Sequence, residues 1–336
     1  MRAITRSKLL PSALWIAVCG SADAHAESGW KIGAEANAFY TDDAALFSVS
    51  RRLSLKDDPT QPIVDRPGQG GDFVYEPSAE VDWIGRNRFG LLRVSLDAGA
   101  YLFTRQTRFS HGLFEFTASQ SFASGTQVSL LYNVTPDLYL GRNLFRALDG
   151  EEFEGNESLT NHYGSIHLDQ ALNESVTVRL LGRYGVRIYN EPFQHRDTEF
   201  WTVGPHFEWR IGPGTELLIG YHYEHGSAAQ QKSPHFPDDV SYVNHYASAE
   251  LSLRPAEKLT ANFIFDYEKN DFTSTNRSDE HFGAAEIVYQ GEIELRYEMT
   301  EHAGIKLGWQ HGRRKLTTEE RAVKNNNVWL GLEYSY

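Results

Sequence analysis

The sequence has almost no cysteine, no long apolar run and no excess of positive charge. Its 336 residues include a single cysteine, and 32 basic side chains are outnumbered by 45 acidic ones, which gives a formal net charge of −13. Contacts to nucleic-acid phosphates need clustered Lys and Arg, so we expect no nucleic-acid partner. No segment reaches about 18 consecutive apolar residues, which excludes a transmembrane helix. The mean hydropathy of −0.47 still allows membrane-crossing strands, in which only alternate residues face lipid.

The first 26 residues have the three parts of a secretory signal peptide. Basic residues come first, the short apolar stretch LLPSALWIAV follows, and Ala24 and Ala26 form an A-x-A arrangement. The pattern predicts cleavage after Ala26 and a mature chain that forms one domain, residues 27–336.

Cleavage there would change the composition of the mature chain. It would remove Cys19, so the mature chain could form no intramolecular disulfide. It would also remove three basic residues and one acidic residue, which moves the formal net charge from −13 to −15. A lipoprotein signal is the alternative, but such signals place a small residue before the cysteine, and Val18 stands there.

Apolar and polar residues alternate along most of the chain. The stretch GLLRVSLDAGAYL places Leu92, Val94 and Leu96 on one face and Arg93, Ser95 and Asp97 on the other, and QVSLLYNVTPDLYLG and VTVRLLGRYGVRIY repeat the pattern. A period of two indicates β-strands, because an amphipathic helix would repeat at three and four residues.

The connections between these strands alternate between short and long. Tight turns are predicted near Arg86–Arg88 and at Ser124, Asn173, Pro213, Ala256 and Thr300. Longer polar segments are predicted at 42–72, 104–112, 143–159, 190–198, 226–240, 270–280 and 315–326. Short turns at one end and long loops at the other are typical of outer-membrane barrels with short periplasmic turns and long extracellular loops. We therefore predict an all-β, closed antiparallel transmembrane β-barrel of about 14 strands.

The first long segment leaves the strand count open. AALFSVSRRLSLKDD also alternates, so 42–72 could form a hairpin arm above the membrane, a loop folded into the pore, or an extra strand that raises the count to 16.

The aromatic residues separate the barrel from a periplasmic β-sandwich or propeller. They lie near strand ends on the apolar face: Trp30, Tyr40, Phe73, Trp83, Phe122, Tyr132, Trp201, Trp209, Tyr221, Tyr223, Phe265, Tyr267, Tyr289, Tyr297 and Trp309. Rings at the two membrane–water levels form the aromatic girdles of such barrels, whereas a sandwich would turn them into its core.

The tail NVWLGLEYSY resembles the C-terminal assembly signal of bacterial outer-membrane β-barrel proteins of the porin-like class. Gly331, Tyr334 and Tyr336 match its glycine followed by aromatics at alternate positions, while Leu330 replaces the usual polar residue before the glycine. The resemblance implies the outer membrane of a Gram-negative bacterium, lipopolysaccharide and other outer-membrane lipid around the barrel, and the barrel-assembly machinery as a partner during biogenesis. It does not identify the cargo.

The polar set of residues would line the lumen of such a barrel, and it is rich in charge. It includes Glu76, Glu80, Asp82, Arg93, Asp97, Glu208, Arg210, Glu250, Asp266, Lys306 and Arg314. The candidate selectivity residues are a ladder of Arg179, Arg183 and Arg187, spaced about 13 Å apart, and the run Glu292, Glu294, Arg296 and Glu298. If the ladder and the acidic residues lie on different walls, they would create a transverse field. Alternatively, they neutralise one another.

Signals for other chemistry are weak. His222 and Glu224 share a strand face, but no third metal ligand can be identified. A lipid-modifying enzyme would need Ser and His together, yet His162 and His245 fall on the apolar face while Ser165 and Ser248 fall on the other. No phosphate loop, dinucleotide motif or Cys/His cluster is present, so we expect no cofactor, no metal and no enzymatic activity.

These patterns predict an outer-membrane channel for passive diffusion of hydrophilic solutes, charged or sugar-like, through a charged lumen. The alternatives are an export conduit for a polysaccharide or protein and an outer-membrane lipid-modifying enzyme. The sequence does not define the direction of transport, the pore size or the oligomeric state.

Overall fold

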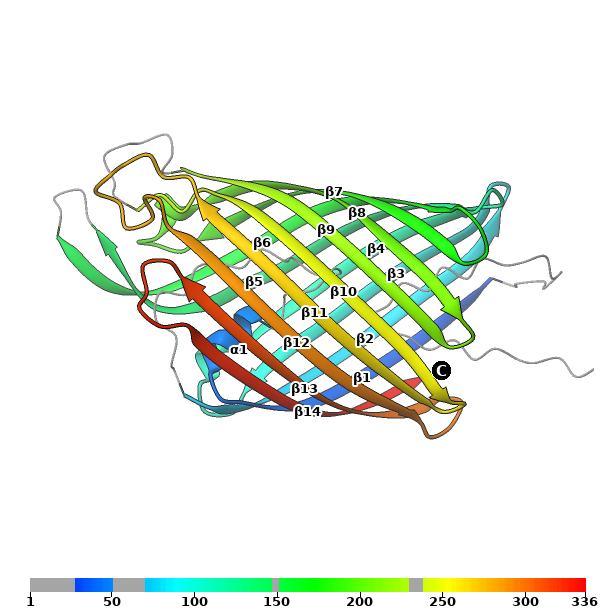
Figure 1. Cartoon of the computed structure of the whole chain (residues 1–336). Helices are drawn as coiled ribbons and strands as arrows, with labels where there is room; N and C mark the ends of the chain where they lie inside the picture. The colour runs from blue at the N-terminus through cyan, green and yellow to red at the C-terminus, as the bar shows by residue number, and fades with distance from the viewer. Residues whose placement is uncertain (1–27, 51–69, 147–150, 230–237) are drawn as a thin grey trace, which may run out of the picture.

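The computed structural model of the chain is a closed antiparallel β-barrel of 14 strands (Figure 1). It describes residues 28–50, 70–146, 151–229 and 238–336. The predicted signal peptide lies outside the described residues. The strands are β1 (Gly29–Thr41), β2 (Asp72–Asn87), β3 (Gly90–Phe103), β4 (His111–Phe122), β5 (Thr126–Arg146), β6 (Glu152–Ala171), β7 (Val176–Tyr189), β8 (Thr198–Gly212), β9 (Thr215–Ala228), β10 (Tyr242–Ala256), β11 (Leu259–Phe272), β12 (Ala285–Glu298), β13 (Ala303–Leu316) and β14 (Val323–Ser335). The fold prediction of 14 strands is confirmed.

Each strand pairs with its neighbours in the chain, and β1 pairs with β14 to close the sheet. Six connections are short: 88–89, 123–125, 172–175, 213–214, 257–258 and 299–302. The connections at the opposite end are generally longer: 42–71, 104–110, 147–151, 190–197, 229–241, 273–284 and 317–322. We call these the short-turn end and the long-loop end; in outer-membrane barrels they face the periplasm and the outside.

One predicted loop is wrong. The segment 143–159 was expected to be a loop, but β5 and β6 continue their pairing through Asn143↔Gly155 to Arg146↔Glu152. They form the longest hairpin of the barrel, with 21 and 20 residues. The apolar alternation stops here because this part of the hairpin rises beyond the ends of its neighbours, where no lipid has to be covered (Figure 1).

Proline accounts for an irregularity within this hairpin. The β5–β6 register shifts between Thr135 and Leu138, around Pro136, and Asp137 has a φ of 45°. Proline cannot donate to the ladder, so the extra residue of a β-bulge accommodates it. Pro77 and Pro205, in β2 and β8, lie in the sheet without a register shift.

The two faces of the barrel are sorted as the alternation predicts. The last strand shows this: Leu330, Leu332 and Tyr334 are 52%, 56% and 53% exposed, whereas the intervening Trp329 is 2% exposed. The exposed apolar residues form the outer surface, where lipid would cover them. An apolar surface this extensive on the outside of a closed barrel is suited to a membrane rather than to water.

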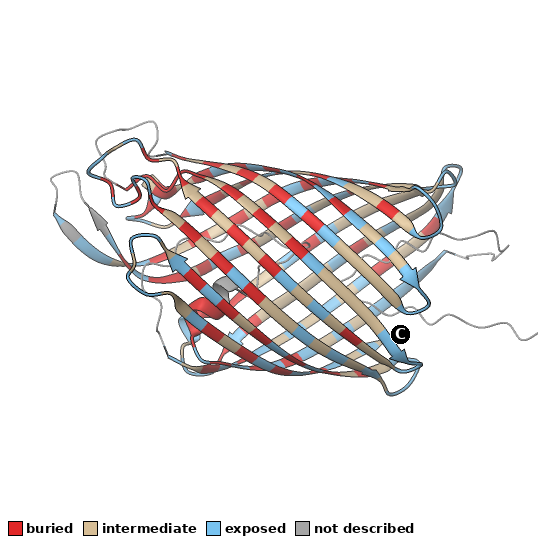
Figure 2. Ribbon diagram, in the orientation of Figure 1, coloured by how far each residue is buried: buried red, intermediate tan, exposed pale blue. Residues whose placement is uncertain are grey.

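The inward face differs between the two ends. Inward residues near the long-loop end are almost fully buried, while many near the short-turn end are intermediate or exposed (Figure 2). On β12, the inward residues Glu286, Val288 and Gln290 are buried, whereas the inward residues from Glu292 to Glu298 are all partly exposed. The interior is therefore filled toward the long loops and accessible toward the short turns.

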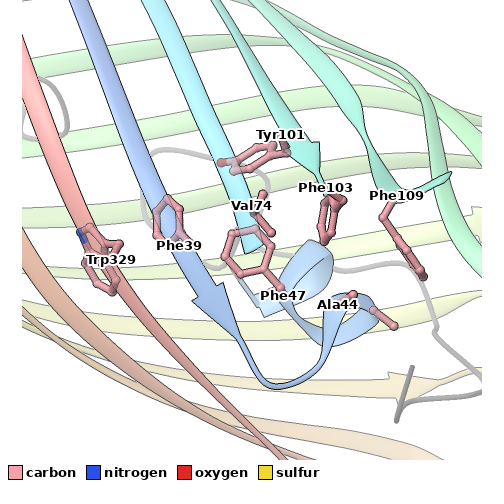
Figure 3. Packing of buried hydrophobic residues seen from close by; sticks show 9 residues of the cluster. Phe39, Ala44, Phe47, Val74, Tyr101, Phe103, Phe109 and Trp329 are labelled. Atoms are coloured by element: carbon pink, nitrogen blue, oxygen red, sulfur yellow. The ribbon is translucent and has the colours of Figure 1, made fainter. Parts of the chain in front are cut away.

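Part of the filling comes from α1 (Ala44–Ser50), the described part of the first long segment. Its Phe47 packs against inward-facing residues of the wall, so this helix lies inside the barrel (Figure 3). Of the three possibilities for 42–72, a loop folded into the pore is the one that the described residues show. Among the described residues, no helix has the length and apolar character needed to cross a membrane.

Candidate functional site: the barrel interior

An aromatic cluster occupies the interior below the long loops (Figure 3). Phe47 of α1 is its hub, with ring centroids 5.2 Å from Phe39, 5.9 Å from Tyr101 and 5.8 Å from Phe103. Phe39 in turn packs on Trp329, at 5.4 Å. These rings come from β1, β3, β14 and the helix, so the cluster ties α1 to one arc of the wall.

Local hydrogen bonds fix the start of α1. The carboxylate of Asp43 accepts hydrogen bonds from the backbone N–H groups of Ala45 and Leu46, at 3.1 Å and 3.5 Å. This is the N-cap arrangement, which satisfies donors that have no partner within the helix. The backbone N–H of Ala44 donates to the carbonyl of Gly70 at 3.0 Å, which joins the two ends of the first long segment.

The Arg ladder on β7 points into the lumen as predicted, but each member contacts residues on its own side of the barrel. Arg179 pairs with Asp169 of the neighbouring strand β6. The guanidinium of Arg183 lies 4.6 Å from the ring centroid of Tyr163. Arg187 reaches further, to Glu224 of β9 at 3.5 Å. A role in selectivity stays a prediction for all three.

Arg187 belongs to a small buried network. It donates to the Tyr242 hydroxyl at 2.5 Å, and that hydroxyl donates to Glu224 at 2.7 Å. Thr202 also donates to Glu224, at 2.5 Å. The guanidinium stacks over Phe200 at 4.3 Å. Glu224 is fully engaged in these contacts, so its carboxylate is part of a hydrogen-bonded network with Arg187, Tyr242 and Thr202.

The charged run on β12 also faces the lumen. Glu292 accepts from Gln310 at 2.9 Å, and Glu298 pairs with Arg254 at 3.2 Å. Arg296 pairs with Glu333 at 2.5 Å. The run is therefore partly neutralised by its surroundings.

The remaining member of the run, Glu294, accepts from the indole N–H of Trp329 at 3.1 Å. Gly308 lies between them on β13, and a Cβ there would fall 2.0 Å from the Trp329 ring. The missing side chain gives the indole room to reach across β13 to Glu294 on β12.

Acidic residues outnumber cationic ones on two arcs of the wall, β9–β12 and β1–β4; the inward face of the latter carries Glu35, Asp72, Glu76, Glu80, Asp82, Asp97 and Glu115. The inward face of β9–β12 carries Glu216, Glu224, Glu250, Asp266, Glu268, Glu286, Glu292, Glu294 and Glu298, with Arg254 and Arg296 as its cationic side chains. The ladder strand β7 adjoins this arc through β8. The cations of β7 thus lie beside one of the arcs that are rich in acidic residues.

Two histidines inside the barrel, His167 and His206, were missed in the sequence, and they lie near His222, which was noted there. The Nε2 atoms of His206 and His222 lie 2.7 Å apart on β8 and β9, and His167 on β6 contacts the Ser165 hydroxyl at 3.2 Å. All three alternate with apolar residues at inward positions, which is the signal that could have identified them. The contact between His206 and His222 spans two adjacent strands, and predicting it requires the pairing register of β8 and β9.

A second buried network ties the long loops together above the lumen. Arg196 donates to both carboxylate oxygens of Glu157 at 3.0 Å and to Asp238 at 2.8 Å and 3.1 Å. The Nε2 atom of His195 lies 2.5 Å from Oδ2 of Asp238. The Nδ1 atom of His281 lies 3.7 Å from Oδ1 of the same carboxylate. The β5–β6 hairpin and the loops after β7, β9 and β11 therefore meet at one guanidinium.

The charges in this loop network shift one another's proton affinities. Burial would raise the pKa of Asp238, but Arg196 and His195 outweigh it and hold this pKa far below its usual value. Burial would lower the pKa of His281, but its hydrogen bond to Asp279 and the charges of Asp238 and Asp279 outweigh burial and raise this pKa. The network therefore favours charged carboxylates facing charged imidazole.

One group of described residues has the spacing of metal ligands. Oxygen and nitrogen atoms of Asp238, Glu280 and His281 lie within 4.8 Å of one another. Arg196 already contacts both carboxylate oxygens of Asp238, so a cation here would have to displace the guanidinium. The arrangement favours an ion-pair network.

The histidines of the outer face contact tyrosines. The Nδ1 atom of His162 lies 2.8 Å from the Tyr132 hydroxyl, and that of His245 lies 2.7 Å from the Tyr221 hydroxyl. Ser165 and Ser248 face the interior and are buried. Neither pair therefore has the geometry of a catalytic Ser and His.

The residues that resemble an assembly signal lie at the closing seam. The backbone of Tyr336 exchanges hydrogen bonds with Ile32 of β1, at 2.9 Å and 3.1 Å, and Tyr334 is exposed on the outer face. Gly331 pairs with Asn37, and a Cβ on it would fall 2.1 Å from the Asn37 side-chain oxygen. This glycine thus has a packing role at the seam, whatever its part in assembly.

No protein-family model matches the chain, and no curated protein matches it in sequence. Among solved structures, the outer-membrane channel DcaP of Acinetobacter baumannii is similar to it with a TM-score of 0.51 and 10% identity, over 93% of this chain and 99% of that one. A bacterial polysaccharide outer-membrane secretin gives a TM-score of 0.48 and 12% identity, over 90% and 98%. OmpT of Vibrio cholerae gives 0.47 and 10%, over 92% and 99%.

The fold is thus that of the outer-membrane β-barrels, in which porins and channels are built. The closed 14-strand sheet, the exposed apolar outer face and the charged inner face place the chain in this porin-like architectural class. At about 10% identity, the likeness extends to the fold alone.

Proposed function

We propose that the protein is an outer-membrane channel for passive diffusion of small hydrophilic solutes. The observation that carries the proposal is the inward face of the short-turn half, which is charged and open to solvent. Side chains there are substantially exposed, 46% for Arg93 and 32% for Glu298. Charges of this kind are stable in a lumen that holds water and costly in a dry core.

The aromatic cluster and α1 would set the narrowest part of the path. They fill one arc of the long-loop half, built from β1, β3 and β14. Solutes would pass between this arc and the polar arc of β7–β12. The acidic excess of that polar arc supports a preference for cations and neutral sugar-like solutes over anions.

The test is the conductance of purified protein in planar bilayers, with ion selectivity measured before and after Arg179, Arg183 and Arg187 are changed to Gln. We expect an open channel whose cation preference increases when the three cations are removed. Absence of conductance would contradict the channel. Unchanged selectivity would remove the ladder from the mechanism and leave the channel in place.

The geometry favours a channel over a lipid-modifying enzyme, because the candidate His and Ser residues lie on opposite faces of the sheet. The measurement that separates the two is hydrolysis of outer-membrane lipid by purified protein. Loss of such an activity on changing His162 and His245 would reverse this conclusion.

An export conduit is a second candidate, supported by the lumen being accessible at the short-turn end. A conduit would receive its cargo from the periplasm, and that end would face it. Conductance that rises strongly when the first long segment is deleted, together with binding of an anionic or neutral polysaccharide from the short-turn side, would favour export over passive diffusion.

A further inference from the structure

The outer face of β13 and β14 carries three exposed cations at the long-loop end. They are Arg313 and Lys315 on β13 and Lys324 on β14. Arg313 and Lys324 are direct partners in the antiparallel register. Side chains at such positions have Cβ atoms about 4.5–5.5 Å apart, and like charges there destabilise a sheet. The barrel thus holds a repulsive pair on its surface.

No carboxylate of the described residues forms an ion pair with any of these three cations. The acids nearby have other partners: Asp42 accepts hydrogen bonds from Asn325 and Asn326, Asp271 pairs with Lys269, and Glu286 pairs with Arg314. In the loop above, Glu319 accepts a hydrogen bond from the backbone N–H of Leu316.

Other outward cations of the long-loop end differ in this respect. Lys269 contacts Asp271 at 2.8 Å, and Arg142 contacts Glu154 at 3.1 Å. Among the described side chains that project outward from the strands at this end, the cations of β13 and β14 are therefore the ones without a carboxylate partner. An anion from outside the protein would remove the repulsion between Arg313 and Lys324.

The surroundings of these cations fit an amphiphile. In the same register row, Tyr267 and Tyr289 stack side by side with ring centroids 5.2 Å apart, and Tyr289 pairs with Arg313. Further along β13 and β14, away from the long loops, the outer face is apolar, with Trp309, Val328 and Leu330 about half exposed. Aromatic rings at this level mark the boundary between headgroups and acyl chains. Cations just above that boundary face lipid phosphates.

We propose that Arg313, Lys315 and Lys324 bind the phosphates of lipopolysaccharide in the outer leaflet, while its acyl chains cover the apolar surface below. The long-loop end faces that leaflet. The two phosphates carried on the sugar headgroup match cations spread over two strands, whereas a phospholipid headgroup presents one. Arg313 contributes a planar donor fork suited to phosphate, and the two lysines contribute point charges.

The test uses the purified full-length mature protein in detergent, with lipopolysaccharide that carries phosphorylated lipid A added in increasing amounts. Retained glycolipid is measured by native mass spectrometry. Neutralising all three cations (R313Q, K315Q and K324Q) should weaken binding by roughly a hundredfold, at about fivefold for each charge. The matched control removes three exposed cations at the short-turn end (R86Q, R88Q and K258Q) and should bind as the wild type does.

Two further measurements complete the test. The first compares other phosphate compounds with lipopolysaccharide, and the second shows whether a variant loses binding without losing stability. Dephosphorylated lipid A, phosphatidylglycerol micelles and inorganic phosphate should each bind the wild type far more weakly; equal binding by any of them would overturn the proposal. Lys324→Glu should pair with Arg313, so its Tm without glycolipid should not fall while its glycolipid binding is lost. Wild-type binding by the triple variant or by Lys324→Glu would also overturn the proposal. Channel conductance, measured separately, should change in neither.

Discussion

The two halves of the barrel interior are built on opposite principles. The long-loop half is filled by the aromatic cluster around Phe47 and covered by the ion-pair network around Arg196. The short-turn half keeps charged side chains such as Arg93 and Glu298 in contact with solvent. One sheet can form both halves because side chains on every strand alternate between the inner and the outer face. Only the size and the contacts of the inward side chains change from one end of a strand to the other. In the proposed channel, the filled half would restrict passage, and the open half would determine which ions gather before the restriction.

The largest effect should follow from removing the hub of the filled half. Phe47→Ala removes a buried ring and should cost about 4 kcal/mol of the packing that holds α1 against the wall. We expect α1 to detach and single-channel conductance to rise severalfold in planar bilayers. Phe282→Ala, at an exposed ring in a long loop, is the control. Equal conductance in both variants would show that α1 does not limit passage.

The next largest effect should come from the loop network. Arg196→Met leaves Glu157 and Asp238 buried without their cation, which should cost about 3 kcal/mol of local stability. Hydrogen exchange and limited proteolysis should then show opening in residues 190–197 and 273–284. Arg277→Met, at an exposed cation in one of these loops, should leave protection unchanged. A similar protection pattern in the two variants would argue against a stabilising role for the network.

A smaller, pH-dependent effect is expected from His281. Its folded-state pKa is raised by Asp279 and Asp238 despite burial, so its contribution is complete below its unfolded value near 6.5 and is lost as the pH rises through the raised value. Asp238 and Asp279, with lowered pKa values, stay charged throughout this range.

Loop-dependent closures of the channel should therefore become more frequent as the pH rises above about 6.5. His281→Gln should flatten this dependence, and His302→Gln at the short-turn end should retain it. A pH profile that His281→Gln leaves unaltered would assign the effect to other groups.

The smallest effect should come from the open half. Glu250→Gln combined with Glu292→Gln removes two carboxylates from the β9–β12 arc and should lower the cation-to-anion permeability ratio by about twofold. Reversal potentials in a salt gradient measure this ratio. Glu199→Gln, at an outward position on β8, serves as the control. If the double variant matches the control, this arc does not govern selectivity.

The sequence predicts the barrel well because alternation is a local property. Each strand face can be assigned from a dozen residues, and the charged residues assigned to the lumen all face it. What alternation cannot give is the partner of each charge. The contact of Arg187 with Glu224 depends on register across two strands, and the meeting of Glu157, Arg196 and Asp238 depends on where the loops after β7 and β9 fold against the β5–β6 hairpin.

The first long segment shows a further limit. Its apolar spacing suited a strand as well as a helix, because a short apolar run satisfies both periods. Tertiary contacts favour the helix, because Phe47 of α1 packs against the rings of Phe39, Tyr101 and Phe103 on the inner wall. The hairpin of β5 and β6 was missed for a related reason, since strands beyond the membrane need no apolar face.

That hairpin has a practical consequence. Its outer part pairs only with itself, and the exposed ion pair of Arg142 and Glu154 lies on it. A peptide tag inserted between Arg146 and Glu152 would be joined to this outer part of β5 and β6, strands that do not pair with β1 or β14 at the closing seam. Antibody labelling of intact cells that carry such a tag would report the orientation of the barrel without perturbing the channel.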